Sequence, residues 1–164
     1  MPERTGLEAR PPSRPRRVIP PPALFFACLL SGWGLGFWKP LRLGLSTVPV
    51  RLVLAVPLFV LVAAIFSRAF RLFRRHETSI SPWGDPPTLI TTGPYRFSRN
   101  PLYVAAVLTL LAFSVLLDSV WIFGFVPVLV LLLDVLVIRR EEALLHQRFG
   151  ERYVAYSARV RRWA

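Results

Sequence analysis

Cysteine and acidic side chains are scarce in this sequence. Cys28 is the only cysteine, which excludes an intrachain disulfide and any metal site built from several cysteines, and we expect no metal site. Nine acidic residues stand against 21 lysines and arginines, so the formal net charge at pH 7 is +12. The basic residues lie at the edges of long apolar runs, where anionic lipid head groups account for them. We therefore expect a membrane as their partner and no nucleic acid.

Long apolar runs are the dominant feature of the chain. Apolar residues make up 54% of it, and the mean hydropathy is +0.47. A helix that spans a bilayer needs roughly 17–25 mostly apolar residues. The runs that reach this length cover approximately residues 22–38, 48–66, 101–117 and 119–138. We therefore predict an all-α, polytopic membrane protein with about four transmembrane helices.

Glycines and prolines inside these runs indicate how the helices pack. Gly32 and Gly36 have the spacing that lets two membrane helices approach closely. Pro57 and Pro127 fall inside the second and fourth runs, where a membrane helix tolerates the lost hydrogen bond and bends. We expect close packing at the glycines and a kink at each proline.

The third and fourth runs are joined at Leu117-Asp118-Ser119, which leaves room only for a tight helical hairpin. The hairpin places the segment before the third run beside the segment after the fourth. Arginine is concentrated in both, as in the cytosolic loops of membrane proteins. We therefore expect the N-terminal arm, the central loop and the C-terminal tail to face the cytosol, in a bacterial inner membrane. The arginines assigned to the central loop are Arg68, Arg71, Arg74, Arg75, Arg96 and Arg99.

Composition divides the chain into three parts. Residues 1–21 form a flexible arm rich in proline and arginine. Residues 22–84 hold the first two membrane helices and a basic cytosolic loop, and residues 85–164 hold the hairpin and a C-terminal helix. A basic arm before an apolar stretch is also how a secretory signal begins, but no small-x-small cleavage site follows. We therefore treat the first apolar run as a membrane helix.

Residues 91–103 form a turn followed by the start of the third run. Gly93-Pro94 is a turn signal. Pro101 suits the first turn of a helix, where its missing N–H would be unpaired in any case. We expect this stretch to lie where the membrane meets water, and we expect the chemistry of the protein here.

Arginine and tyrosine side chains follow this turn. Arg96 and Arg99, together with free N–H groups at the helix start, favour an anion such as a carboxylate or a phosphate. Each arginine can equally anchor a lipid head group. Tyr95 and Tyr103 either belong to the interfacial aromatic belt or form a wall for a flat ring.

Glu141 and Glu142 stand out because seven arginines and only three acidic residues follow the fourth run. The hairpin brings them near the turn, so a pocket with both signs of charge is expected. A solvated ion pair with Arg139 or Arg140 is the plainer interpretation. Asp134 lies deeper on the same helix face, and a carboxylate within the membrane is a functional hypothesis by default.

Apolar and aromatic residues recur on one helical face past the fourth run. They are Leu145, Phe149, Tyr153, Tyr156 and Val160. Gly150 interrupts the pattern and can end one helix and begin another. This amphipathic segment either lies on the membrane surface or acts as a lid whose aromatic face covers the pocket.

Together these elements resemble the C-terminal signature of the isoprenylcysteine carboxyl methyltransferase and phospholipid methyltransferase superfamily. The similarity covers roughly residues 85–163. It lies in Gly93-Pro94-Tyr95-Arg96, Arg99-Asn100-Pro101-Leu102-Tyr103, Glu141-Glu142 and Arg148-Phe149-Gly150. The resemblance implies an enzyme that transfers the methyl group of S-adenosylmethionine to a small lipophilic acceptor, a carboxylate or an amine, which enters from the bilayer.

The resemblance also implies which residues form the cofactor site. Arginine and helix N–H groups suit the cofactor carboxylate, tyrosine suits the adenine face, and glutamate suits ribose hydroxyls or a cationic centre. The residues expected to bind the cofactor are Gly93, Pro94, Tyr95, Arg96, Arg99, Asn100, Pro101, Tyr103, Glu141 and Glu142. Those expected to take part in catalysis are Arg99, Asn100 and Glu142.

Asn100 departs from the family pattern, because the best-known members have histidine at this place. Asparagine still donates and accepts hydrogen bonds, but it does not replace an imidazole in proton transfer. An amine acceptor must first lose a proton, for which Glu141, Glu142 and His146 are the candidates.

Two other functions also fit the residues: a nicotinamide-dependent membrane reductase of related fold, and a non-catalytic scaffold or lipid-binding membrane protein.

Overall fold

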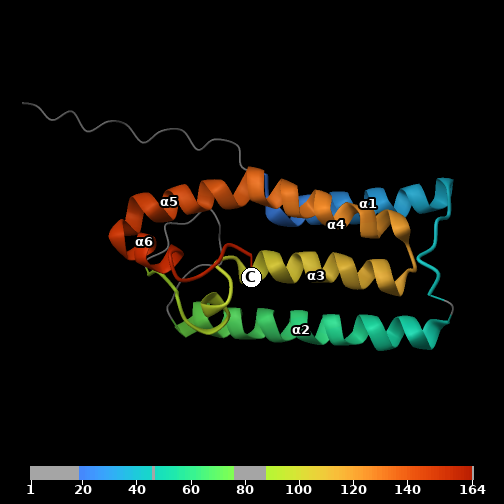
Figure 1. The fold of residues 1–164 in the computed structure, drawn as a ribbon, viewed down its shortest axis with the longest axis horizontal. Helices are drawn as coiled ribbons and strands as arrows, with labels where there is room; N and C mark the ends of the chain where they lie inside the picture. The colour runs from blue at the N-terminus through green and yellow to red at the C-terminus, as the bar shows by residue number, and fades with distance from the viewer. Residues whose placement is uncertain (1–18, 46, 76–87, 164) are drawn as a thin grey trace, which may run out of the picture.

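The computed structural model describes residues 19–45, 47–75 and 88–163, and every regular element in them is helical. The elements are α1 (Pro21–Trp38), α2 (Val48–Arg75), η1 (Gly93–Arg96), α3 (Pro101–Leu116), α4 (Val120–Leu133), η2 (Asp134–Ile138), α5 (Arg139–Phe149) and α6 (Glu151–Ser157). In Figure 1 the four longest helices lie along the long axis, with α3 between α2 and the pair of α1 and α4. The all-α prediction is confirmed for the described residues. Most of the predicted N-terminal arm and part of the central loop lie outside them.

Among the described residues, three helices are long and apolar enough to cross a membrane. They cover Pro21–Trp38, Val48–Arg74 and Val120–Phe149. The apolar helix α3 has only 16 residues, slightly fewer than a crossing requires. The described residues thus fit an integral membrane protein with three helices of spanning length, where the sequence predicted about four.

The helix α2 is longer than the sequence pattern predicted. The prediction ended the second run at residue 66 and assigned the arginines that follow to a loop, whereas the helix continues to Arg75. Its inner face stays packed in this extension, because Ala69 is fully buried and the Leu72 side chain lies beside Gly93. The arginines found on the helix instead of in a loop are Arg68, Arg71, Arg74 and Arg75.

The core joins α1 to α3, α4 and η2. Its buried members are Leu24, Cys28, Leu110, Ile122, Leu129, Leu133, Val137 and Ile138. Gly32 continues the buried stripe of α1, and a Cβ added there would lie 2.9 Å from the Ile122 Cα atom. A Cβ at Gly36 would meet nothing within 4 Å, so the close approach predicted at both glycines is found at Gly32 alone. The buried residues of α1 are Leu24, Cys28 and Gly32, so its packed face ends before Gly36 and only Gly32 is in close contact. Pro57 and Pro127 lie inside α2 and α4, and their kinks stay predictions.

The predicted tight connection between the third and fourth runs is present and is closed by an acidic side chain. Asp118, at a φ of 52°, is 4% exposed. Its Oδ1 accepts a hydrogen bond from Leu45 N at 3.1 Å, and its Oδ2 lies 3.0 Å from Arg51 Nη2. These contacts, named the hairpin clamp below, tie the segment between α1 and α2 to the turn between α3 and α4.

The C-terminal part closes the opposite end of the bundle. Gly150, at a φ of 51°, separates α5 from α6, so the predicted amphipathic segment forms two helices. Tyr153 and Tyr156 on α6 are buried against the bundle. The chain then returns to the start of α3, where Arg99 N donates a hydrogen bond to Arg161 O at 2.9 Å. The beginning of α3 is therefore enclosed by segments that follow it by more than 50 residues.

Candidate functional site

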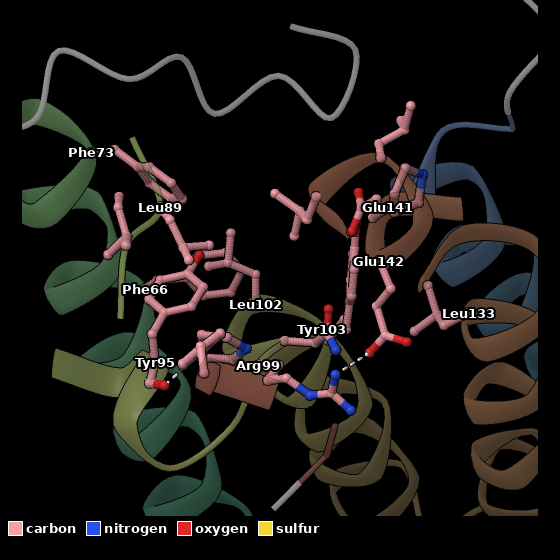
Figure 2. Close-up of a pocket in the computed structure, with 18 of the residues that line it drawn as sticks. Phe66, Phe73, Leu89, Tyr95, Arg99, Leu102, Tyr103, Leu133, Glu141 and Glu142 are labelled. Atoms are coloured by element: carbon pink, nitrogen blue, oxygen red, sulfur yellow. Dashed lines mark hydrogen bonds and ion pairs between the residues drawn. The ribbon is translucent and has the colours of Figure 1, made fainter. Parts of the chain in front are cut away.

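A cavity of about 520 Å³ lies at the end of the bundle where α3 begins. In Figure 2 its floor is α3, with Phe66 and Phe73 of α2 on one side and Leu133, Glu141 and Glu142 on the other. Most of the wall is hydrocarbon, and the charged groups gather around Arg99. This combination of apolar walls and a few convergent polar groups is typical of small-molecule sites. The uncharged lining residues come from all four long helices, from η1, α5 and α6, and from residues 88–90 and 100.

The turn before α3 is built by its own sequence. Gly93 has a φ of 62°, a conformation that glycine adopts without strain, and a Cβ there would lie 2.8 Å from the Leu72 side chain. η1 follows, closed by a hydrogen bond of 3.2 Å from Phe97 N to Pro94 O. α3 then starts with Pro101 at its first position, as predicted. These backbone features aim Tyr95 and Arg99 at the cavity.

The structure brings most of the predicted site residues together. Those that line the cavity are Tyr95, Arg99, Asn100, Pro101, Tyr103, Glu141 and Glu142. Those that do not line it are Gly93, Pro94 and Arg96, which form the turn beside it. Arg96 is exposed to solvent. The part of the turn that faces the cavity is therefore the Tyr95 side chain.

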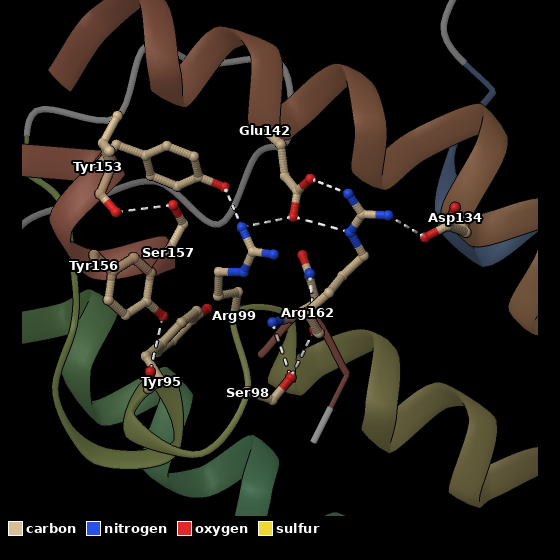
Figure 3. Close-up of polar contacts among 11 residues, drawn as sticks. Tyr95, Ser98, Arg99, Asp134, Glu142, Tyr153, Tyr156, Ser157 and Arg162 are labelled. Atoms are coloured by element: carbon tan, nitrogen blue, oxygen red, sulfur yellow. Dashed lines mark hydrogen bonds and ion pairs between the residues drawn. The ribbon is translucent and has the colours of Figure 1, made fainter. Parts of the chain in front are cut away.

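A network of five charged side chains begins at the polar end of the cavity, which Arg99 and Glu142 line. Figure 3 shows four of its members, Arg99, Glu142, Arg162 and Asp134. Arg99 Nη1 lies 3.1 Å from Glu142 Oε1, and both side chains are about 15% exposed, at 16% and 15%. Arg162 binds the same carboxylate with two atoms, Nε to Oε1 at 3.1 Å and Nη2 to Oε2. Its Nη1 also lies 3.0 Å from Asp134 Oδ1, and Arg139 Nε lies 3.0 Å from Oδ2 of that aspartate. The network thus carries three positive and two negative charges.

Arg99 has donor capacity beyond these contacts. Its Nη1 also donates to the Tyr153 hydroxyl at 3.4 Å. Its Nε is buried and has no hydrogen-bond partner among the described residues. Arg99 lines the cavity, and a guanidinium there is suited to a bound anion.

Glu141 differs from Glu142 in its partners. It lines the same cavity and accepts a hydrogen bond of 2.7 Å from the Tyr103 hydroxyl. Within the described part of the chain it has no ion pair, whereas Glu142 has two. The two adjacent glutamates therefore offer different chemistry: one carboxylate is neutralised by arginine, and the other is held by a neutral phenol.

Asn100 contacts the C-terminal segment. Its Nδ2 donates to Arg162 O at 3.1 Å, and the Ser98 hydroxyl donates to the same oxygen, also at 3.1 Å. The Asn100 amide is thus used at least in part to hold the tail, although the residue lines the cavity. His146, a candidate base from the sequence, is exposed on α5 and does not line the cavity.

All four tyrosines of the chain line the cavity: Tyr95, Tyr103, Tyr153 and Tyr156. Burial raises the pKa of Tyr156 to about 12, and it also raises the pKa of Tyr95 and Tyr153 above the usual value. These phenols are neutral near pH 7, and the Tyr156 hydroxyl donates to Tyr95 O at 2.8 Å. The aromatic face predicted for α6 therefore packs against the predicted turn.

A π-helical turn, η2, joins α4 to α5 and precedes the glutamates by one turn. π-helical turns interrupt the regular helical spacing and recur at functional sites. Here the Arg162 side chain reaches both Asp134, at the start of η2, and Glu142 on α5. The shared helix face predicted for these two acids is consistent with that contact.

Sequence reasoning missed two parts of the site. Pro21, Pro22 and Phe25 of α1 line the cavity, but nothing distinguishes them from other apolar residues of that run. Arg162 was one of seven arginines after the fourth run, and only the local excess of positive charge hinted at a buried acidic partner. No group of three histidine, cysteine, aspartate or glutamate side chains able to hold a metal occurs in the described residues.

Comparison with known proteins agrees with the motifs. The chain matches the family model of the phospholipid methyltransferases over residues 50–152, which is more than half of its length. The matched region contains every predicted site residue that lines the cavity. No curated protein and no solved structure matches the chain significantly. On the strength of the matched region, the chain belongs to the phospholipid methyltransferase family.

Proposed function

We propose that this protein is an integral membrane methyltransferase that uses S-adenosylmethionine to methylate a small lipophilic acceptor. Membership in the phospholipid methyltransferase family implies methyl transfer, and three helices of spanning length fit a membrane enzyme. The observation that carries the proposal is the cavity, which is lined mostly by residues of the matched region and joins a charged end to apolar walls. Its volume of about 520 Å³ lies within the usual range for small-molecule sites.

The residues at the polar end fit the cofactor. The Arg99 guanidinium suits its carboxylate, and the four tyrosines offer aromatic faces to adenine. Glu141 and Glu142 suit ribose hydroxyls or the positive charge of the sulfonium. When bound, S-adenosylmethionine supplies an activated methyl group. What the protein residues then contribute is alignment of the two reactants and exclusion of water.

The apolar walls suit the acceptor. Phe25, Phe66 and Leu129 come from three different helices, so a hydrocarbon group is bound between helices within the bilayer. If the acceptor is a carboxylate, it is already ionised and needs no base. If it is an amine, Glu141 is the better base, because Glu142 is held by two arginines whereas Glu141 accepts only the Tyr103 hydroxyl in the described structure.

The membrane arrangement is also part of the proposal. α3 is apolar and packs against α2 and α4, so we infer that it lies in the bilayer as a fourth, shorter membrane helix. The arginine-rich end with α5 and α6 then faces the cytosol, which is the source of the soluble cofactor. The hairpin clamp then lies at the opposite side of the membrane.

Binding of labelled S-adenosylmethionine to the purified protein in detergent tests the proposal. We expect saturable binding that Glu142→Ala weakens strongly and that Glu151→Ala leaves unchanged, because Glu151 is exposed on α6 and does not line the cavity. Undetectable binding at millimolar cofactor by folded protein would contradict the proposal. A rise in the thermal unfolding midpoint with NADPH but not with S-adenosylmethionine would favour the reductase.

A further inference from the structure

The last residues of the described chain contact residues that line the cavity, although they lie beyond the region that matches the family. The match ends at residue 152, whereas Arg161 and Arg162 contact residues at the start of α3. Trp163 packs against the buried core cluster. The segment 161–163 is thus anchored on both sides of Arg162, and this fixes where the arginine side chain can reach.

Two arginines bind the one carboxylate of Glu142, in different ways. Arg99 contacts a single oxygen, Oε1, at 3.1 Å and lines the cavity. Arg162 contacts both oxygens and does not line the cavity. Arg162 is therefore the permanent partner of Glu142, and Arg99 is the partner that a ligand can reach.

An anionic ligand at Arg99 competes with Glu142 for the same guanidinium. If Arg99 were the only counter-charge of Glu142, binding would leave a largely buried carboxylate unpaired, which is strongly unfavourable. Arg162 removes this obstacle, because it keeps Glu142 neutralised when Arg99 turns to the ligand. Asp134 is likewise bound by two arginines, Arg139 and Arg162. It therefore keeps a positive partner in Arg139, and Arg162 can stay in place on Glu142.

We propose that Arg162 is a positioning residue for ligand binding: it holds Glu142 so that Arg99 is released to bind the carboxylate of an anionic ligand. The inference rests on the proposed function, which makes the amino-acid carboxylate of S-adenosylmethionine that anion. Arg162 acts through Glu142 and Arg99 and does not touch the ligand.

The test compares two ligands that differ only in the carboxylate. S-adenosylhomocysteine has the α-carboxylate, and its decarboxylated analogue has hydrogen in that place. Arg162→Gln is expected to weaken binding of S-adenosylhomocysteine about tenfold or more, as the loss of one partner of a buried charge pair does. It is expected to leave the affinity for the decarboxylated analogue unchanged. Isothermal titration calorimetry of the full chain in detergent measures both.

Arg159→Gln is the matched control, because it removes the same charge three residues away. Its side chain is exposed and donates to the Ala155 carbonyl of α6, so both affinities should stay at the wild-type values. Arg162→Lys serves if the glutamine variant does not fold. Lysine keeps the charge but lacks the fork that binds both oxygens of Glu142. A smaller loss of affinity, again confined to S-adenosylhomocysteine, is expected.

The outcomes separate the two proposals. If the wild-type protein binds neither ligand, the proposed function fails, and the role of Arg162 fails with it. If the wild-type protein binds S-adenosylhomocysteine and an Arg162 variant loses affinity for both ligands equally, Arg162 is merely structural and only the inference is overturned. Unchanged affinity for both ligands in a folded Arg162 variant also overturns the inference and leaves the proposed function intact.

Discussion

The two ends of the helix bundle are both closed by arginine–carboxylate contacts, and their surroundings differ. In the hairpin clamp, Asp118 uses both oxygens, one on Leu45 N and one on Arg51, beside a cavity of about 260 Å³. At the other end, a network of five charged side chains begins at Arg99 and Glu142, which line a cavity of about 520 Å³. The Nε of Arg99 has no partner in the described structure. The same interaction completes the fold at one end. At the other end it lies at a cavity wall, which is why we propose ligand binding there.

Neutralising Glu142 should give the largest effect on ligand binding. Glu142→Gln removes the carboxylate that we propose faces the ribose hydroxyls or the sulfonium of the cofactor. We expect S-adenosylmethionine affinity to fall by about 2–5 kcal/mol, the usual result when one partner of a buried charge pair is lost. Calorimetric titration of the purified protein measures this. An affinity within twofold of the wild-type value would mean that the charged end is not the cofactor site.

Neutralising Asp118 tests the other end. Asp118→Asn leaves Arg51 without its charge partner, so we expect the free energy of unfolding to fall by about 1–3 kcal/mol with no change in cofactor affinity. Thermal unfolding in detergent, with and without S-adenosylmethionine, measures both quantities. Arg42→Gln is the control, because Arg42 is exposed close to the same turn. A large loss of affinity in Asp118→Asn would remove the distinction between the ends.

Single hydrogen bonds allow a finer comparison. Tyr103→Phe removes the donor to Glu141, and Trp121→Phe removes a 2.7 Å bond from Trp121 Nε1 to Lys39 O at the hairpin end. Each should lower the free energy of unfolding by about 0.5–1.5 kcal/mol, the usual net value of a hydrogen bond. Only Tyr103→Phe should also weaken cofactor binding. Equal effects on binding would show that the hydrogen bond to Glu141 serves stability alone.

The sequence was most informative where a local rule determined the geometry. The short connection at Asp118 allowed only a hairpin, and this predicted that Glu141 and Glu142 would lie near the turn before α3. The apolar runs predicted helices, but they did not set their ends: α2 continues past residue 66 because Ala69 and Leu72 still have packing partners. The length and hydropathy of an apolar run predict whether a helix can cross a membrane. They do not predict whether its last turns have packing partners, and so they do not predict where the helix ends.

The contacts of the tail could not be predicted in the same way. Arg162 and Glu142 are 20 residues apart, and Asn100 and the Arg162 carbonyl are 62 residues apart. No periodicity connects such positions, and nothing in the residue type distinguishes Arg162 from the other arginines that follow the fourth run. The role predicted for Asn100 in catalysis stays a prediction. The structure shows that its amide donates a hydrogen bond to the Arg162 carbonyl and so helps to hold the tail.

The smallest expected effect concerns alkaline pH. All four tyrosines lie at the cavity end, so ionisation of phenols should act on this end alone. Burial raises the pKa of Tyr156 from 10 to about 12, which means that the folded state favours the neutral form. This contribution to stability is complete below pH 10 and is lost as the pH rises toward 12. Thermal unfolding between pH 8 and about 11 should therefore show a falling midpoint above pH 10, with a shallower fall in Tyr156→Phe. An equally steep fall in that variant would mean that groups other than Tyr156 cause the loss of stability at alkaline pH. The tyrosine would then not distinguish the cavity end from the hairpin end.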